Sequence, residues 1–367
     1  MTLSVGIVGL PNVGKSTLFN ALSAQQAEAA NYAFCTIDPN VGIVTVPDPR
    51  FDALCERVRP HKRIAATVAF TDIAGLVKGA SKGEGRGNAF LSHIRDCDAI
   101  AHVVRCFDDA GVLHVDGRVD PVADVETIHT ELMLRDLDTV RRRLERARKL
   151  SKGQDPVERQ ACAVCEQLAS ALDRGLRAAL VPVKEGGEAR IVRELCLLTA
   201  KPLFYIANVS EKQLAHQARD PLLARLRQVA GREGAPLNVI CAAVEAEIMQ
   251  LPPAERPEFL ASLGLEEPSL DEVIRTGYRM LDLITFFTAG PKEVRAWTIK
   301  AGSKAPQAAG RIHSDFERGF IRAEVIAWRD LVELGSEAAC RSAGKLGVEG
   351  KDYRVRDGDV IHFRFNV

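Results

Sequence analysis

The sequence has no excess of charge of either sign, and it has few aromatic residues. Its 367 residues include 49 lysines and arginines and 49 aspartates and glutamates, so the formal net charge is zero. This balance excludes a protein that holds nucleic acid or membrane by bulk charge, although local patches can still do so. Aromatic residues make up 5% of the chain, so stacking platforms for single-stranded nucleic acid are not indicated.

Long apolar runs and paired cysteines are lacking as well. The longest stretch without a charged residue, Met1–Gly14, is too short to span a bilayer, and no charged segment precedes it. The nine cysteines are an odd number scattered over a long chain, which favours a reducing compartment over a disulfide framework. We therefore expect a soluble cytoplasmic protein without membrane association.

What the sequence does contain is typical of an α/β protein. With 46% hydrophobic residues the chain can form real cores, and its length suggests two or three domains of roughly 150 residues. Six short apolar runs alternate with helix-like stretches, which predicts buried parallel strands. These runs are Leu3–Val8, Val41–Val46, Thr67–Phe70, Ala99–Val104, Leu203–Ala207 and Leu237–Ile240.

A helical segment interrupts this alternation between the fourth and fifth runs. One apolar stripe at coiled-coil spacing consists of Met133, Leu137, Val140, Leu144 and Ala147. A second stripe consists of Val157, Ala161, Val164, Leu168 and Leu172. Between them Asp155 is placed as a helix N-cap and Pro156 at the first helical position. We expect an antiparallel hairpin in which each helix buries its stripe against the other.

The C-terminal part of the chain differs again. Residues Pro268–Asp282 are predicted to form a helix. Turn signals and short strand-like runs follow, and the chain ends in the alternating segment Val360–Val367. The last ~90 residues are long enough for a separate domain.

The strongest motif directly follows the first predicted strand. Gly9–Thr17 matches the phosphate-binding pattern G-x-x-x-x-G-K-[ST]. Glycines let the backbone N–H groups curl toward phosphates, and the next helix offers its positive N-terminus. Lys15 would reach the β- and γ-phosphate oxygens, and Ser16 would ligate Mg²⁺. The residues expected at the phosphates are Asn12, Val13, Gly14, Lys15, Ser16 and Thr17.

Two further segments complete the expected phosphate side. Asp72-Ile73-Ala74-Gly75 ends the third strand, where Asp72 can hold Mg²⁺ through water and the Gly75 N–H can sense the γ-phosphate. A D-x-x-G motif is weak alone, and its place downstream of the loop supports it. Thr36, within Asn31–Gly42, is the candidate for closing over Mg²⁺, the alternative being a solvated loop threonine.

Base selection is expected after the fifth strand, where GTPases carry N-K-x-D. Here the residues are Asn208, Val209, Ser210 and Glu211. Glu211 is one methylene longer than aspartate, and Val209 lacks the lysine stem that covers a guanine, so buried polar groups of a guanine site would be left unpaired. We therefore predict ATP as the ligand, with GTP weaker and Asn208 reading adenine. Cys241 and Ala242, after the sixth strand, are expected to support the base through their backbone.

These motifs together resemble one family. The segments G-L-P-N-V-G-K-S-T, N-Y-A-F-C-T-I-D-P-N, D-I-A-G-L-V-K-G-A-S and N-V-S-E are similar to those of the YchF/Obg-like ATPases, and Arg311–Ile321 is similar to part of a TGS domain. The resemblance covers essentially the whole chain. Two departures are Ala33, where relatives commonly have proline, and Cys241, where serine is more usual.

The resemblance implies a fold and a function. It implies a P-loop NTPase G domain at residues 1–121 and 201–277, an inserted antiparallel α-helical coiled-coil hairpin at 122–200, and a C-terminal α+β TGS (ubiquitin-like) domain at 278–367. It also implies a slowly ATP-hydrolysing switch that associates with ribosomes and regulates translation or a stress response. Two alternatives stay open: a GTPase of the same class, and a nucleotide-stabilised scaffold with incidental hydrolysis.

The sequence lacks the side chain that orients the attacking water in Ras-like enzymes. Leu76 follows Gly75, where Ras-like enzymes have the glutamine that orients water. We expect catalysis to rest on Lys15, Thr36, Gly75 and His114. The role of His114 is implied by the resemblance, against the alternative of a solvated loop histidine. Asn12 could help coordinate K⁺ beside the phosphates, or serve only as a turn-forming residue.

Two segments carry a local excess of basic residues. Arg135–Lys152 has a net charge of +5, and Lys292–Arg322 has a net charge of +4. Either could be an ordinary solvated face. Together they predict a ribosome or ribosomal RNA partner that is contacted through phosphates, by the helical hairpin and the C-terminal domain.

Overall fold

The structure is a computed structural model, and it describes residues 3–25, 40–73, 86–109, 111–114, 117–151 and 155–366. The chain divides into two compact units. Unit 1 contains Met1–Gly42 and Ala69–Val273, and unit 2 contains Ile43–Val68 and Ile274–Val367. Each unit is built on its own six-stranded sheet.

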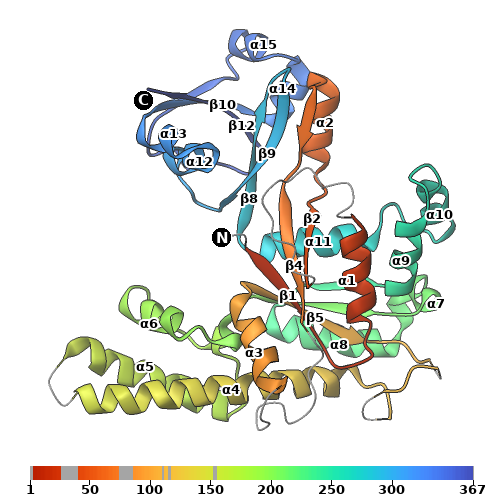
Figure 1. The fold of residues 1–367 in the computed structure, drawn as a ribbon, viewed down its shortest axis with the longest axis vertical. Coiled ribbons are helices and arrows are strands. Elements are labelled where there is room, and N and C mark those ends of the chain that lie inside the picture. Colours follow the sequence, from red (N-terminus) through yellow and green to blue (C-terminus); the bar gives the residue numbers. More distant parts are fainter. Residues whose placement is uncertain are drawn as a thin grey trace. The chain divides into compact units, whose positions relative to one another are not determined.

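The first sheet, most of which belongs to unit 1, confirms all six predicted strands. Its order is β2-β4-β1-β5-β6-β7 (Figure 1). The strands are β1 (Ser4–Val8), β2 (Val41–Thr45), β4 (Thr67–Asp72), β5 (Ala99–Arg105), β6 (Leu203–Asn208) and β7 (Leu237–Ile240). Residues 43–45 of β2 and 67–68 of β4 fall within the range of unit 2. The pairs β1·β4, β1·β5, β5·β6 and β6·β7 are parallel. Because strands β5 and β6 are buried at every position, their sequences are continuous apolar runs rather than alternating ones.

Helices follow the strands of unit 1. They are α1 (Lys15–Ala24), α3 (Arg86–Asp96), α4 (Pro121–Leu150), α5 (Pro156–Asp173), α6 (Gly187–Leu195), α7 (Glu211–Leu214), α8 (Pro221–Glu233), α9 (Ala242–Gln250), α10 (Arg256–Ser262) and α11 (Ser269–Met280), the last of which continues into unit 2. Helix α11 confirms the helix predicted at Pro268–Asp282. The strand-to-helix connections place Gly14, Asn208 and Cys241 at the carboxyl ends of parallel strands, which is where α/β sheets bind ligands.

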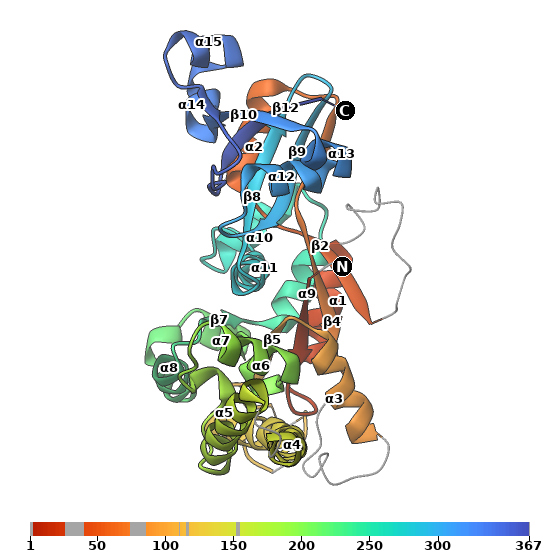
Figure 2. The same cartoon turned by 90° about the vertical axis from the view of Figure 1, so that its left-hand side faces the viewer.

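Helices α4 and α5 lie side by side, as Figures 1 and 2 both show. The carboxylate of Asp155 accepts the N–H of Val157 at the start of α5, which confirms the predicted cap. Both predicted stripes enter one shared apolar cluster. Val157 is an exception, because it is 58% exposed in the first turn of α5. It lies near the turn between the helices, where the facing end of α4 also leaves Leu150 exposed.

The sheet of unit 2 has the order β11-β10-β12-β8-β9-β3. Its strands are β3 (Lys62–Ile64), β8 (Leu283–Ala289), β9 (Glu293–Lys300), β10 (Phe320–Ala327), β11 (Gly347–Glu349) and β12 (Asp359–Phe365), the last confirming the predicted terminal strand. Its helices are α2 (Pro49–Val58), α12 (Ala305–Ile312), α13 (Ser314–Arg318), α14 (Trp328–Leu334) and α15 (Glu337–Ser342). Short 3-10 turns η3 (Ala178–Leu180) and η4 (Leu198–Ala200) belong to unit 1.

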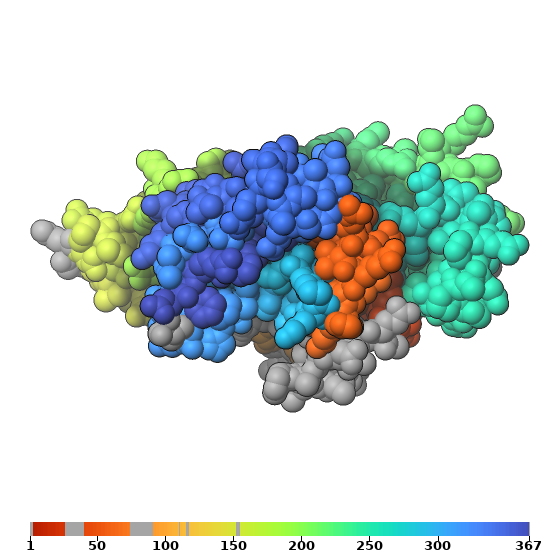
Figure 3. Space-filling model, turned by 90° about the horizontal axis from the view of Figure 1, so that it is seen from above, coloured from red at the N-terminus to blue at the C-terminus, as the bar shows by residue number. Residues whose placement is uncertain are grey.

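Residues 43–68 differ from the expected division of the chain. The predicted nucleotide domain, residues 1–121 and 201–277, includes them, whereas the structure places them in unit 2. The reason is that β3 pairs with β9 in parallel, and Phe51 of α2 stacks on Phe287 of β8 with ring centroids 6.4 Å apart. In Figure 3 the orange atoms of this segment lie directly against blue atoms of the C-terminal residues.

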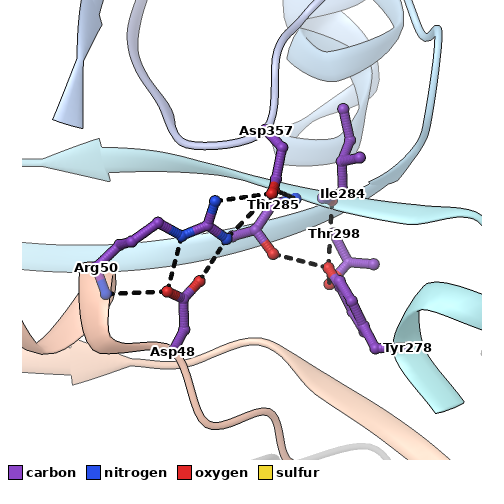
Figure 4. A network of polar contacts seen from close by, with 7 residues as sticks. All are labelled: Asp48, Arg50, Tyr278, Ile284, Thr285, Thr298 and Asp357. Atoms are coloured by element: carbon purple, nitrogen blue, oxygen red, sulfur yellow. Dashed lines mark hydrogen bonds and ion pairs between the residues drawn. The ribbon is translucent and has the colours of Figure 1, made fainter. Parts of the chain in front are cut away.

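A polar network also fixes this segment to the rest of unit 2 (Figure 4). Asp48 caps α2, and the Arg50 guanidinium bridges Asp48 at 2.8 Å and Asp357 at 2.7 Å. Asp357 in turn accepts the backbone N–H of Thr285 in β8 at 2.9 Å. The two carboxylates hold the pKa of Arg50 above its ordinary value despite its partial burial. Bidentate arginine pairs of this kind are directional, so they fix the position of α2 in unit 2.

Candidate functional site

A cavity of about 520 Å³ opens where four loops of unit 1 meet. The loops follow β1, β5, β6 and β7, so strands that are far apart in the sequence supply one site. The cavity is lined by Asn12, Gly14, Lys15, Ser16, Thr17, Phe107, Asp109, Val112, Asn208, Val209, Ser210, Glu211, Cys241, Ala242, Ala243, Val244 and Glu247. Ten of the eleven residues predicted from the sequence to contact the nucleotide are among them, and Val13 is the exception.

The glycine-rich loop owes its shape to two left-handed residues. Asn12 has φ 62° and Gly14 has φ 97°, conformations that suit asparagine and glycine better than other residues. Gly14 is also required sterically, because a Cβ there would lie 2.2 Å from Nδ2 of Asn208. Helix α1 begins at Lys15 with no side-chain cap at its N-terminus. Its first N–H groups therefore suit an anion such as a phosphate.

Lys15 and Asp72 form the charged part of the site. Nζ of Lys15 donates to the carbonyl of Leu10 at 2.6 Å. Burial lowers the pKa of Lys15 to about 8, and the nearby Asp72 carboxylate opposes that shift. Burial likewise raises the pKa of Asp72, and Lys15 opposes it. Among the described residues, the buried Oδ1 of Asp72 has no hydrogen-bond partner. An orphaned carboxylate oxygen beside Lys15 fits a hard divalent cation such as Mg²⁺.

Asn208 joins two loops of the cavity. Its Nδ2 donates to the carbonyl of Val13 at 2.9 Å, and its Oδ1 accepts the N–H of Ala242 at 3.0 Å. The side chain is buried, and both ends of the amide are used to join the glycine-rich loop to the start of α9. These two bonds use one N–H and one oxygen lone pair of the amide, and each end of the group can form a second bond, so the reading of adenine by Asn208 stays a prediction.

The other base-side residues lie where the sequence indicated. Val209, Glu211 and Cys241 line the cavity, and Glu211 is exposed in the first turn of α7. Burial raises the pKa of the Cys241 thiol, so it is an uncharged neighbour of the cavity. The backbone N–H of Ala242 donates to Oδ1 of Asn208, so this N–H supports the Asn208 side chain. Val13 is fully buried beneath the loop and serves through its carbonyl.

Sequence reasoning missed the loop after β5. Phe107, Asp109 and Val112 line the cavity. The buried side chain of Arg105 holds the backbone of this loop in place by hydrogen bonds. Arg105 is 1% exposed, and its guanidinium donates to the carbonyls of Phe107 at 3.0 Å, Val112 at 3.0 Å and Asp109 at 3.3 Å. The available signal was an arginine that directly follows the apolar run Ala99–Val104, at a position where a buried strand ends.

His114 belongs to the same loop but does not line the cavity. Its Nε2 lies 3.1 Å from Oδ2 of Asp124, in the first turn of α4, and both side chains are buried. The alternative of a solvated histidine is therefore wrong. Nearby, Nδ2 of Asn12 donates to the carbonyl of Leu113 at 3.2 Å. The glycine-rich loop is thus bonded to the residue that precedes His114.

Two predicted site residues, Thr36 and Gly75, lie outside the described residues. Within the described part of the chain, no group of three or more His, Cys, Asp or Glu side chains is arranged to hold a metal. Of the three residues predicted to hold Mg²⁺, the structure describes Ser16 and Asp72, and Thr36 lies outside the described residues. None of the described helices is both long enough and apolar enough to pass through a bilayer.

The basic segment of α4 is partly neutralised by α5. Ion pairs join Arg141 to Asp173 at 3.1 Å, Arg143 to Glu158 at 2.8 Å, and Arg148 to Glu166 at 2.9 Å. These three carboxylates reduce the local net charge from +5 to +2. The pair of helices is therefore less cationic than the basic segment of α4 alone suggests.

Comparison with known proteins gives full-length matches. A family model described as a 50S ribosome-binding GTPase matches residues 4–137, and a model for the C-terminal domain of YchF GTPases matches residues 283–366. The Ribosome-binding ATPase YchF of Bacillus subtilis is 53% identical over 367 residues, covering 100% of both chains. The Obg-like ATPase 1 of Pongo abelii is 43% identical over 369 residues, covering 100% of this chain and 93% of that one.

A solved structure agrees with these matches. The Schizosaccharomyces pombe YchF GTPase has a TM-score of 0.89 and 41% sequence identity, covering 99% of this chain and 98% of that chain. Identity above half along the whole length, together with this agreement in fold, leaves no part of the chain unmatched. The chain belongs to the YchF family of P-loop nucleotide hydrolases.

Proposed function

We propose that this protein is an ATP-binding, slowly ATP-hydrolysing switch that associates with ribosomes in the cytoplasm and regulates translation or a stress response. One observation carries the proposal: the glycine-rich loop and the base-side loops that the sequence predicts line a single cavity of about 520 Å³. The relatives named Ribosome-binding ATPase YchF, at 52–53% identity, support the ribosome as partner.

On the phosphate side, Lys15 leaves the Leu10 carbonyl and pairs with the β- and γ-phosphates. The N–H groups at the start of α1 bind the same phosphates, and Thr17 lies beside them in the cavity. Ser16 and Asp72 would hold Mg²⁺, joined by Thr36 when a γ-phosphate is present, and the Gly75 N–H would sense that phosphate. When bound, Mg²⁺ supplies charge neutralisation at the transferred phosphoryl group.

On the base side, we propose that ATP binds more tightly than GTP. Glu211 stands where an aspartate would accept the two guanine donors, and Val209 provides no lysine stem. Asn208 bonds to Val13 and Ala242, and we propose that the second N–H and the second lone pair of its amide read adenine. Glu211, Cys241 and the shape of the cavity complete the selection. A GTPase is the second candidate, because the matching family model and the fission yeast structure both carry that description.

For hydrolysis we propose that His114 acts after its loop moves, since the buried imidazole does not line the cavity. The Asn12 side chain, whose amide nitrogen donates to Leu113, would coordinate K⁺ through its amide oxygen. We expect His114→Ala to lower partner-stimulated turnover while leaving ATP affinity nearly unchanged, as measured by phosphate release and by ATP titration. Unaltered stimulation would remove His114 from the mechanism.

We also infer the finer domain identities from the family. Helices α4 and α5 would form its coiled-coil hairpin, supported by their shared apolar cluster. Unit 2 would be its TGS, ubiquitin-like domain, supported by a mixed sheet that packs on α12.

Co-sedimentation with purified ribosomes tests the proposal directly. We expect the full chain to sediment with ribosomes more strongly in one nucleotide state than in the other, and less strongly as salt is raised. Binding that ignores both nucleotide and salt would contradict a nucleotide-controlled RNA contact. A Lys15→Ala protein that keeps its cellular effect would instead favour a scaffold with incidental hydrolysis.

A further inference from the structure

The two faces of the unit 2 sheet pack against different helices. Ala323 and Val325 of β10, with Ile361 and Phe363 of β12, share an apolar cluster with the alanines of α12. Residues between them on the same strands point to the opposite face. There Ile326 pairs with Val360 in register, both are buried, and helix α14 packs against both strands.

Beyond the Ile326–Val360 pair, the next residues on this face of β10 and β12 are no longer covered by helix α14. Glu324 pairs with His362, and Arg322 pairs with Arg364, so these four side chains continue the row that Ile326 and Val360 begin. His362 and both arginines are exposed, whereas Glu324 is 5% exposed. This part of the sheet is therefore polar where the adjoining part is apolar.

Three arginines converge on the single buried carboxylate. Nη2 of Arg364 donates to Oε2 of Glu324 at 3.1 Å, Nη2 of Arg341 from α15 lies 3.5 Å from the same oxygen, and Nη2 of Arg322 lies 3.6 Å from Oε1. The hydrogen bond from Arg364, with the neighbouring positive charges, lowers the pKa of Glu324. Glu324 therefore stays ionised and holds three guanidinium groups in one place.

These residues leave a net charge of +2 on a small area. The side chains of Arg341, Arg322 and Arg364 are 62%, 53% and 45% exposed. Each guanidinium has five N–H donors, and only one nitrogen of each faces Glu324 in these pairs. The remaining donors form a fork that matches phosphate oxygens bidentately.

We propose that Arg322, Arg341 and Arg364 form a phosphate-binding face for the backbone of RNA, with Glu324 as the residue that orients them. The inference deepens the proposed ribosome association and rests on it. RNA is favoured over an acidic protein because protein interfaces depend on a buried apolar or aromatic anchor. Beside Glu324, in register on β11, the described residues offer only the exposed Val348.

This face differs from the basic segment that the sequence suggested. Of the basic residues in Lys292–Arg322, Lys304 pairs with Asp352 and Arg318 pairs with Asp315, each with a carboxylate of its own. Only Arg322 belongs to the arginine face, and Arg341 and Arg364 lie outside the segment. The excess charge is therefore concentrated by the folding of β10, β12 and α15.

The test compares two triple variants of the full chain with equal charge change. One is Arg322→Gln/Arg341→Gln/Arg364→Gln. The matched control is Lys304→Gln/Arg311→Gln/Arg318→Gln, which alters exposed residues on α12, at its N-cap and on α13. We expect the first to weaken binding to purified ribosomes and to a labelled RNA duplex at least tenfold. Its salt slope should fall by about two, as the loss of two or three phosphate contacts requires.

The control triple should bind within about threefold of the original protein, and both triples should keep its ATPase rate without ribosomes. The first triple removes all three ion pairs of the buried Glu324 carboxylate, so its thermal midpoint should fall. Binding is therefore compared at a temperature at which circular dichroism shows both triples to be fully folded. Equal weakening by both triples would overturn the proposal in favour of bulk charge. Weakened binding to ribosomes without weakened binding to the RNA duplex would overturn RNA as the partner. If the original protein itself fails to bind ribosomes, the proposed function fails; if it binds and the first triple binds equally well, only this face fails.

The Glu324→Gln variant distinguishes the orienting role of Glu324 from the effect of the net charge of this face. The variant adds one positive charge to the face, so a charge-only account expects tighter binding to the duplex. If Glu324 orients the guanidinium groups, binding weakens although the net charge rises. Tighter binding would contradict the orienting role.

Discussion

The phosphate side and the base side of the cavity are built in different ways. Among the residues that line the cavity, those on the phosphate side come from one continuous segment, Gly9–Thr17, whose backbone conformation is set by Asn12 and Gly14. The base side is assembled from the loops after β5, β6 and β7, which meet only in the folded chain. Backbone recognition is therefore local in the sequence, whereas side-chain recognition depends on tertiary structure.

The two sides are joined by one side chain. Asn208 bonds to Val13 on the phosphate side and to Ala242 on the base side. This difference between the two sides predicts how substitutions on each side change nucleotide affinity. Changes on the phosphate side should affect every nucleotide, and changes on the base side should affect one nucleotide more than another.

The largest effect is expected from Lys15→Ala on the phosphate side. Removing a buried ammonium that pairs with phosphates costs about 3 kcal/mol, or roughly 100-fold in affinity. Because phosphates are common to all nucleotides, ATP and GTP should weaken in parallel in a titration with fluorescent analogues. A variant that loses ATP but keeps GTP would contradict the division between the two sides.

A smaller effect is expected from Gly14→Ala, which tests the junction of the two sides. The new Cβ would clash with Nδ2 of Asn208. Residue 14 also has a left-handed backbone conformation, and this strain alone costs alanine about 1–2 kcal/mol. Nucleotide affinity and the thermal midpoint should both fall.

Gly231→Ala is the matched control for this substitution. Gly231 lies within α8 and a Cβ there meets nothing within 4 Å, so alanine should stabilise the chain by about 0.5–1 kcal/mol. Equal destabilisation by both alanines would show that the Gly14–Asn208 contact is unimportant.

A still smaller effect on affinity is expected from Arg105→Gln on the base side. Losing the guanidinium releases the carbonyls of Phe107, Asp109 and Val112, which should weaken nucleotide binding by about 1 kcal/mol, or roughly fivefold. Arg105→Lys keeps the charge but cannot reach three carbonyls at once. Full rescue of affinity by lysine, measured in the same titration, would show that charge rather than the hydrogen bonds matters.

The sequence predicted the parts of the fold that depend on local pattern. All six strands of unit 1 and the cap of α5 at Asp155 follow from apolar runs and capping signals. The place of residues 43–68 did not follow, because a three-residue edge strand such as β3 and the stack of Phe51 on Phe287 are tertiary features.

The site divides in the same way. The glycine-rich loop was predictable because its glycines and Lys15 act within one turn of chain. The roles of Asn208 and Arg105 were not, because each depends on which carbonyls lie within reach after folding. The buried pairing of His114 with Asp124 was also beyond prediction, because it joins a loop to the first turn of α4.

The measurement that tests the account most directly is a side-by-side titration of ATP and GTP on the purified full chain, with Glu211→Asp beside it. If Glu211 misplaces the guanine contacts, ATP binds at least about tenfold more tightly than GTP, and Glu211→Asp narrows that ratio without changing the effect of Lys15→Ala. Equal affinities, or tighter binding of GTP by the unaltered chain, would contradict the assignment of the base side to adenine.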